Sequence, residues 1–211
     1  IQLEAARLDA EMNQYNDMNA EMTSIFPDIE HSGPEEHLLA VQKIKEACGI
    51  PVIASLNAVQ KDTWIEWAKK LAGTGVDGLE LNFFANPEIQ TADGASIEKD
   101  QIAVVNEVAS AVDIPVSVKM SVFYTAPLAV AREFAGAGAR GLVLFNQFFQ
   151  PDINPEREES TIQMNLSEPN AHRLPLRYSG LLFGETEASI IASSGIMDAM
   201  DVARMLLAGA D

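Results

Sequence analysis

Two patterns of hydrophobic and polar positions alternate along the chain. Short runs of aliphatic and β-branched residues are typical of strands that are covered on both faces. Between these runs, apolar residues recur at steps of three and four, as in helices with one buried face. The expected strands lie near residues 51–56, 78–82, 114–119, 141–146 and 189–193, and a sixth begins at Asp211. Strands and helices that alternate in this way favour parallel βαβ units.

The first 50 residues have the spacing of helices. Residues 2–22 place apolar side chains at steps of three and four, with acidic residues between them. Residues 32–35, Ser-Gly-Pro-Glu, resemble a capping box with an early proline and predict the start of a second helix. One face of that helix carries Leu38, Val41, Ile44 and Cys48. We therefore expect Cys48 to be a buried structural thiol rather than a nucleophile.

Two phrases of the sequence return after 63 to 64 residues. The run Ile-Pro-Val at Ile50 occurs again at Ile114, and the Gly-rich phrase around Gly75 occurs again around Gly138. A third copy of the second phrase begins at Leu207. A repeated two-strand unit fits a parallel (β/α)₈ TIM barrel. A doubly wound open sheet is the alternative, since periodicity does not show closure, although no Gly-x-Gly-x-x-Gly follows a strand.

One long segment interrupts this repetition. Residues 147–187 exceed the length of a plain loop, and residues 161–166 alternate between apolar and polar positions. We predict an insertion on the C-terminal face of the barrel, where it could wall or cover a site. The repeat also predicts two strands before residue 1, and the last strand, which begins at Asp211, would continue beyond it. We therefore interpret residues 1–211 as one barrel domain that is incomplete at both ends.

The composition excludes several classes of function. The chain has 14 basic and 31 acidic residues, and its net charge of −17 argues against binding nucleic acid or an anionic membrane surface. No apolar run approaches the roughly 18 residues that span a bilayer. The single cysteine cannot form an internal disulfide, which favours a reducing compartment. We expect a cytoplasmic protein.

Polar residues gather where the predicted strands end. In a parallel barrel the active site lies at the C-terminal ends of the strands. Those positions hold Asn57, Asn82, Lys119 and Asn146. An asparagine after a strand is often only a turn residue. Lys119, however, follows a run that predicts a buried strand, and buried lysines are rare unless they are paired. A functional role is therefore favoured for Lys119.

The segment Ser193–Ile196 joins a late strand to a helix. Its small residues allow backbone N–H groups to approach an anion, and the following helix adds partial positive charge. A late strand with this arrangement commonly holds phosphate in barrel enzymes. The alternative is a tight turn without a ligand.

Other types of site lack support in the sequence. His31, His37 and His172 do not have the spacing of zinc ligands, and His37 fits an ordinary surface position. Neither a nucleophile elbow nor a Walker loop is present. The methionines fall at core-facing spacing. We therefore expect no metal site.

The strand ends resemble those of the dihydroorotate dehydrogenase family, and most closely those of the branch described as dihydroorotate dehydrogenase-like. Four segments carry the resemblance, namely Leu79–Asn82, Val116–Lys119, Leu144–Asn146 and Ala192–Ile196. It covers roughly residues 34–211 and is weakest over residues 1–33 and 150–187. The resemblance implies an FMN-binding barrel that oxidises dihydroorotate or a related small substrate, as in pyrimidine biosynthesis. It also implies a separate electron acceptor and a homodimer.

The same resemblance assigns roles to five residues. Lys119 is the implied catalytic residue, placed at the N1/O2 edge of the flavin. Asn82 and Asn146 would contact the flavin and the substrate. Ser194 and Gly195 would hold the FMN phosphate through their backbone. A fixed cation near N1/O2 stabilises the negative charge that reduction creates there, which agrees with the role of Lys119.

The sequence departs from the family beside Asn82. Family members that oxidise dihydroorotate have a Cys or Ser as general base at the position of Ala85, and alanine cannot accept a proton. Thr91, Asp93 and Tyr124 are other candidate bases. Two alternatives therefore stay open. One is an FMN-binding barrel without dihydroorotate dehydrogenase activity, and the other is a phosphate-binding lyase with Lys119 as a Schiff-base nucleophile.

Overall fold

Aliphatic strand residues place the centre of the molecule in a parallel sheet. The computed structural model describes residues 34–58, 60–83, 93–146, 151–162 and 167–211. The five strands of the sheet are β1 (Ile53–Leu56), β2 (Gly78–Asn82), β3 (Val116–Lys119), β4 (Gly141–Leu144) and β7 (Ser189–Ala192). Their spatial order is β1-β2-β3-β4-β7, and every neighbouring pair is parallel.

This strand order decides between the two predicted architectures. A doubly wound sheet reverses its strand order at a switch point. Here each strand lies beside the one before it in the chain, apart from the β5–β6 hairpin inserted after β4. The described strands and helices therefore form an arc of a (β/α) barrel, as predicted.

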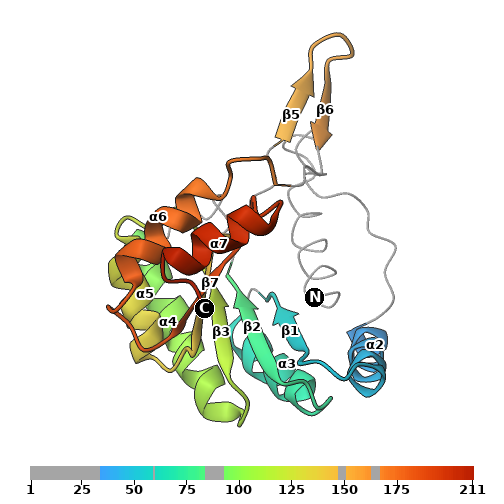
Figure 1. Ribbon diagram of the computed structural model, residues 1–211. Helices are drawn as coiled ribbons and strands as arrows, with labels where there is room; N and C mark the ends of the chain where they lie inside the picture. Colours follow the sequence, from blue (N-terminus) through green and yellow to red (C-terminus); the bar gives the residue numbers. More distant parts are fainter. Residues whose placement is uncertain (1–33, 59, 84–92, 147–150, 163–166) are drawn as a thin grey trace.

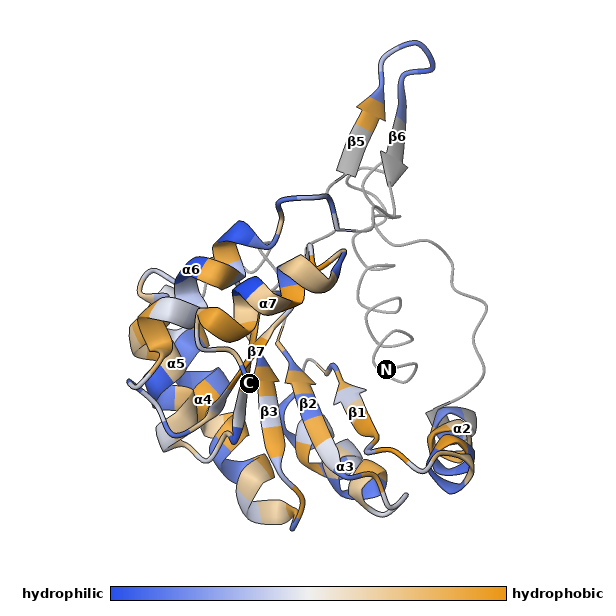
Figure 2. Ribbon diagram, in the orientation of Figure 1, coloured by the Kyte–Doolittle hydropathy of each residue, from blue (hydrophilic) through white to orange (hydrophobic). Residues whose placement is uncertain are grey.

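Helices connect the strands and cover one face of the sheet (Figure 1). The helices are α2 (Pro34–Ala47), α3 (Lys61–Ala72), α4 (Gly94–Ala111), α5 (Pro127–Gly136), α6 (Arg173–Leu182) and α7 (Ala199–Leu207). The hydropathy of the helices is drawn in Figure 2, and α3, α4 and α5 each bury an apolar stripe. This arrangement buries one face of each of these three helices, which is the main source of stability for such amphipathic helices.

Alternate residues of each strand belong to different environments. Leu79 and Leu81 are fully buried and pair with Val116 and Val118. The residues between them share the opposite, inner face of the sheet, because residues paired in register point the same way. Aromatic side chains extend the outer core, where Phe83 lies 5.8 Å from Phe134 between ring centroids.

The Gly-rich phrase has a clear structural reason. Gly75, Gly138 and Gly209 each follow a helix and have φ values of 84°, 111° and 100°. This left-handed conformation is accessible to glycine at little cost and ends a helix. Asp77 then donates its N–H to Val52, and Asp211 donates its N–H to Ile190 in the same way. Asp211 thus pairs with β7 at the point where the sequence predicts a sixth strand.

The segment predicted as an insertion contains two different structures. Its first part forms the antiparallel hairpin of β5 (Pro151–Asn154) and β6 (Glu159–Ile162). This hairpin projects from the side of the barrel to which the strands point (Figure 1). Its second part contains α6, which packs on β4 and β7 like the other helices of the barrel. The sequence pattern did not predict α6 because Pro175 interrupts it, although Pro175 lies in the first helical turn, where proline is tolerated.

Two predictions of burial are wrong. Cys48 is exposed, because α2 ends at Ala47 and the face predicted to be buried is already exposed at Ile44. Met120 and Met205 belong to the core as expected, but Met197 and Met200 are exposed. In α7 the residues that face the barrel are Asp201 and Met205, so the other apolar positions of that helix point outward.

Several predictions fall on residues that the structure does not describe. They are the helix over residues 2–22, His31, the segment 163–166, and Ala85 with its neighbours to residue 92. His37 is exposed, in agreement with a surface position. Within the described ranges, no helix has the length and apolarity to cross a membrane, and no group of three or more possible ligands forms a metal site.

Candidate active site at the strand ends

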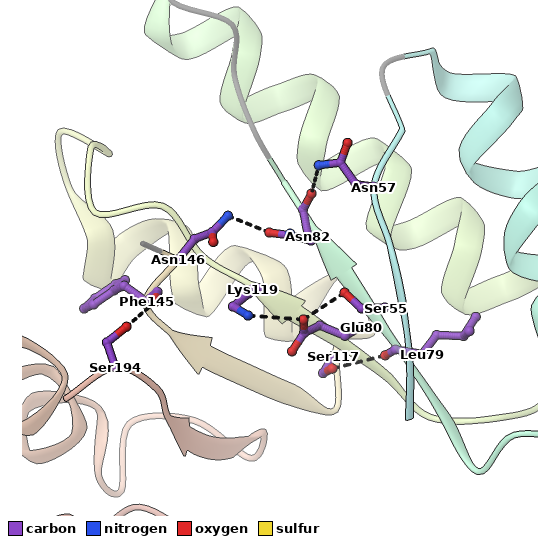
Figure 3. A network of polar contacts seen from close by, with 10 residues as sticks. All are labelled: Ser55, Asn57, Leu79, Glu80, Asn82, Ser117, Lys119, Phe145, Asn146 and Ser194. Carbon is purple, nitrogen blue, oxygen red and sulfur yellow. Dashed lines mark hydrogen bonds and ion pairs between the residues drawn. The ribbon is translucent and has the colours of Figure 1, made fainter. Parts of the chain in front are cut away.

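The polar residues predicted at the strand ends come together at one end of the sheet. Asn82 and Lys119 end neighbouring strands and are partners in the β2–β3 register. Asn146 follows β4, and Ser194 follows β7. Figure 3 shows the four side chains around the same opening. The structure therefore brings together residues that are up to 112 positions apart in the chain (82 to 194).

Lys119 forms an ion pair inside the barrel. Its Nζ lies 3.6 Å from Oε1 of Glu80, and the two side chains are only 25% and 18% exposed. The same oxygen of Glu80 accepts a hydrogen bond of 3.0 Å from the Ser55 hydroxyl. A partly buried lysine is thus paired, as expected for a charge that has left bulk water.

A second set of hydrogen bonds fixes the asparagines. Nδ2 of Asn146 donates to Oδ1 of Asn82 over 2.6 Å. Asn57 donates from its Nδ2 to the backbone oxygen of Asn82 over 2.8 Å. Asn82 is therefore held from both sides, and both strand-end amides have defined orientations before any ligand binds.

The turn after β7 exposes backbone donors. Ser194 and Gly195 have φ values of 80° and 69°, so two consecutive residues have positive φ. Within the described part of the chain, the N–H groups of Ser194, Gly195 and Ile196 have no hydrogen-bond acceptor. Successive free N–H groups in a turn are a suitable binding site for an anion. A Cβ at Gly195 would lie 2.3 Å from the backbone nitrogen of His172, so only glycine fits there.

A buried carboxylate supports this turn. Oδ2 of Asp201 accepts a 3.0 Å hydrogen bond from the N–H of Met197, and Oδ1 accepts from Arg204. Nδ1 of His172 lies 3.7 Å from Asp201 and, in the described residues, has no hydrogen-bond partner. The N–H of Met197, followed by Arg204 and His172, holds the pKa of the Asp201 carboxyl below its ordinary value. The turn is therefore anchored to α7 by a hydrogen bond, and His172, directly before α6, lies beside the same carboxylate.

Two of the candidate bases are already engaged. Asp93 accepts a hydrogen bond of 2.7 Å from the N–H of Ser96 and caps α4. The Tyr124 hydroxyl donates to Gln101 over 2.7 Å, while burial, with a smaller contribution from Glu98, raises the pKa of this phenol well above its ordinary value. Asp93 therefore has a structural role at the start of α4, and Tyr124 has one in packing against Gln101. Thr91 and Ala85 lie outside the described residues.

The sequence pattern assigned no role to Glu80, Ser55 or Asn57, although Asn57 was noted at a strand end. The sequence did contain a sign of their position, because Ser55 and Asn57 are two residues apart in one strand, as are Glu80 and Asn82 in the next. Residues two apart in a strand point to the same face of the sheet. The missing information was the register that places neighbouring strands side by side.

A pocket of about 460 Å³ lies at the opposite end of the strands, around the loops that enter β3 and β4. It includes Asp113 and Arg140 but none of the strand-end residues. In barrels of this class the chemistry lies at the C-terminal face. We therefore assign the candidate active site to the strand ends rather than to this pocket.

Comparison with known proteins identifies the relatives of the chain. No protein-family model matches it. It is 33% identical over 183 residues to the Aeropyrum pernix protein named "Putative dihydroorotate dehydrogenase A (fumarate)", covering 83% of this chain and 58% of that protein. It is 30% identical over 195 residues to the "Dihydroorotate dehydrogenase B (NAD(+)), catalytic subunit" of Methanopyrus kandleri, covering 86% and 60%. The chain is a homologue of the dihydroorotate dehydrogenases.

Solved structures support the fold of this dihydroorotate dehydrogenase homologue. Phosphonopyruvate hydrolase has a TM-score of 0.57 at 11% identity, covering 87% of this chain and 60% of the other. Deoxyribose phosphate aldolase from Aeropyrum pernix has a TM-score of 0.54 at 14% identity, covering 83% and 68%. At such low identity the likeness concerns the barrel fold alone.

The chain spans a little more than half of the length of its curated relatives, namely 58% of the Aeropyrum pernix protein and 60% of the Methanopyrus kandleri protein.

Proposed function

We propose that this protein is an FMN-dependent oxidoreductase that oxidises dihydroorotate, or a related small substrate, with hydride transfer to the flavin. The observation that carries the proposal is the shared position of Lys119 and the Ser194–Gly195 turn at one mouth of the barrel. Sequence similarity to dihydroorotate dehydrogenases supports it. A cation and a phosphate site around one opening are what a flavin mononucleotide requires.

The donor set fits FMN. The N–H groups of Ser194 and Gly195 have no acceptor among the described residues, and they would bind the phosphate. Lys119 would lie at the N1/O2 edge of the ring system, where negative charge develops on reduction. The amides of Asn82 and Asn146 offer donors and acceptors for the flavin and for the substrate.

FMN, when bound, supplies the hydride acceptor, and the protein supplies position and electric field. Lys119 holds a fixed positive charge inside the barrel, where the exclusion of water strengthens its electrostatic interactions. Preorganised groups of this kind lower a barrier by about 3–4 kcal/mol. Asn82 and Asn146, already oriented by their mutual hydrogen bond, would bind the substrate without first losing side-chain entropy.

Ala85 stands where the related enzymes have their general base, so the base of the proposed reaction is not assigned. An enzyme that oxidises dihydroorotate must remove a proton, and an alanine side chain cannot accept it. A flavin-binding barrel that lacks this activity is therefore the second candidate. The lyase alternative has less support, because Lys119 lies beside a carboxylate and a Schiff-base lysine needs an apolar or cationic neighbourhood.

We further propose a cytoplasmic homodimer that passes electrons from the flavin to a separate acceptor and serves pyrimidine biosynthesis. These properties follow from the family resemblance. The names of the relatives point to different acceptors, fumarate in one and NAD⁺ in another.

The visible spectrum of the purified full-length protein tests cofactor binding. We expect the absorption of bound oxidised flavin, or its recovery when FMN is added to the apoprotein. A colourless protein that FMN does not reconstitute would rule out the proposed cofactor.

Anaerobic reduction tests the substrate. Dihydroorotate should bleach the bound flavin at a rate consistent with turnover. If flavin binds but does not bleach, the second candidate is correct, and Ala85→Cys or Ala85→Ser should then produce activity if only the base is missing.

A further inference from the structure

The inner face of the barrel is unusual beside Lys119. Barrel interiors are mostly filled by branched apolar side chains, as Val143 and Ile191 fill the inner face of β4 and β7. Val143 and Ile191 lie in register with Lys119, whereas the next inner layer down holds Ser55, Glu80 and Ser117 on β1, β2 and β3 and continues into Gly141 and Ser189. A polar layer therefore lies directly below the strand-end residues, and it contains one acid.

Glu80 is the acid that meets Lys119. Its Oε1 lies 3.6 Å from Nζ of Lys119 and accepts the hydroxyl of Ser55 at 3.0 Å. Among the described residues, Glu80 is the only carboxylate within ion-pair distance of Lys119. Figure 3 shows the two side chains directed toward each other from neighbouring strands. Glu80 lies two positions before Asn82 on the same face of β2, away from the mouth of the barrel.

We infer that Glu80 is a positioning residue for Lys119. The carboxylate fixes the ammonium group and offsets part of its charge, so it sets how strongly the site favours reduced over oxidised flavin. In water such a pair would have little effect, but both side chains are mostly buried and are screened less than surface charges. Ser55 holds the carboxylate in place from the other side. The part of this inference that concerns the flavin rests on the proposed function.

A double-mutant cycle on the apoprotein tests the pair without any flavin. Removing one partner of a buried ion pair leaves an unpaired charge, whereas replacing both by apolar residues is often neutral. We expect Glu80→Met to lower the melting temperature by several degrees. The double variant Glu80→Met/Lys119→Met should recover most of that loss. A double variant no more stable than Glu80→Met would show that Glu80 does not act through Lys119.

The reduction potential of the bound flavin tests the electrostatic role. Glu80→Gln keeps the shape of the side chain and its bond to Ser55 but removes the negative charge. The potential should become more positive, because the charge of Lys119 is no longer offset. A tenfold change in the ratio of affinities for reduced and oxidised flavin corresponds to about 30 mV for a two-electron couple. Glu80→Asp keeps the charge and should stay closer to the wild-type potential.

The matched control is Glu66→Gln, which removes the same charge from an exposed Glu66–Lys70 pair on α3. It should leave the potential unchanged. If Glu80→Gln binds FMN with an unshifted potential, this inference is overturned while the proposed function stands. If the wild-type protein binds no FMN, the proposed function fails together with the flavin part of the inference. The melting temperatures of the cycle then still decide whether Glu80 and Lys119 act as a pair.

Discussion

Lys119 is the residue on which most of the chemistry depends. Among the described residues it combines a place at a strand end, partial burial and a single ion pair with Glu80. Its sequence context already indicated a function, because a lysine that ends an apolar strand is rarely there for packing. The side chain therefore has to be tested for catalysis separately from binding.

Replacing Lys119 should affect the rate of flavin reduction more than the affinity for FMN. Lys119→Ala removes a fixed cation from the place where negative charge develops, and we expect a rate about 10²- to 10³-fold lower. The dissociation constant for FMN should rise much less, because the phosphate is held elsewhere. Anaerobic stopped-flow reduction and fluorescence titration measure the two quantities.

Lys70→Ala is the control, since Lys70 forms an ion pair with Glu66 on the surface of α3. It should change neither the rate of flavin reduction nor the dissociation constant for FMN. Equal losses of rate and affinity in Lys119→Ala would contradict a catalytic role for the cation.

Gly195 is the second residue whose identity the structure explains. Its φ of 69° and the 2.3 Å distance from an added Cβ to the nitrogen of His172 leave no room for a side chain. Gly195→Ala should lower the free energy of unfolding by more than about 1 kcal/mol and weaken FMN binding, because the turn must shift. Urea unfolding of the apoprotein and FMN titration check this.

Gly94→Ala gives the comparison for Gly195, because Gly94 begins α4 with no atom within 4 Å of an added Cβ. It should be neutral or slightly stabilising. A Gly195→Ala variant with wild-type FMN affinity would argue against a phosphate site at this turn.

At the scale of elements, Asp77 joins the beginning of β2 to β1. Its carboxylate accepts hydrogen bonds of 2.6 Å from Lys45 on α2 and from the N–H of Val52. The bond from Lys45, then that from Val52, holds the pKa of this carboxyl below its ordinary value of 3.8. One side chain thus connects a helix and the edge of the sheet.

This lowered pKa makes the contribution of Asp77 dependent on pH. The folded state binds the proton less readily than the unfolded state, so the stabilisation is present at neutral pH and is lost as the pH falls below about 4. Asp77→Asn should lower the melting temperature at pH 7, and the difference from wild type should narrow near pH 3. Asp113→Asn, an exposed aspartate before β3, is the control. A difference that is the same at both pH values would contradict the ion-pair explanation.

At the scale of the whole molecule, Phe134 links the helical layer to the mouth of the barrel. It is fully buried in α5, and its ring lies 5.8 Å from Phe83 and 6.1 Å from Tyr124 between centroids. Phe83 follows Asn82 directly, and Tyr124 lies in the loop after Lys119. The packing of one helix residue therefore supports the ends of two strands.

Removal of the Phe134 ring should be among the most destabilising changes in the core. Phe134→Ala leaves a cavity and should cost about 3–5 kcal/mol of unfolding free energy. Leu207→Ala, at a position 89% exposed, should change it by less than about 0.5 kcal/mol. Chemical denaturation measures the unfolding free energy of both variants. Comparable losses would contradict the burial of Phe134 and the exposure of Leu207.

The sequence alone determined most of the elements and several of the site residues. Apolar runs, helical spacing and the glycines at positive φ are local features, so the strands, the helix order and the repeated turn could be read from them. Lys119 and the Ser194–Gly195 turn were also found, because each conflicts with an ordinary local structure. The helix α6 was missed because Pro175 interrupts its pattern. Cys48 was placed in the core because helical spacing alone does not show where a helix ends against the sheet.

Only the tertiary structure decided which residues meet. Asn146 donates to Asn82 across 64 residues of sequence, and Glu80 faces Lys119 from another strand. Such contacts depend on the register between strands and on the order of strands in the sheet, which the spacing of residues within one strand does not contain. The sequence thus specified a lysine at the mouth of a barrel, and the fold supplied the acid beside it.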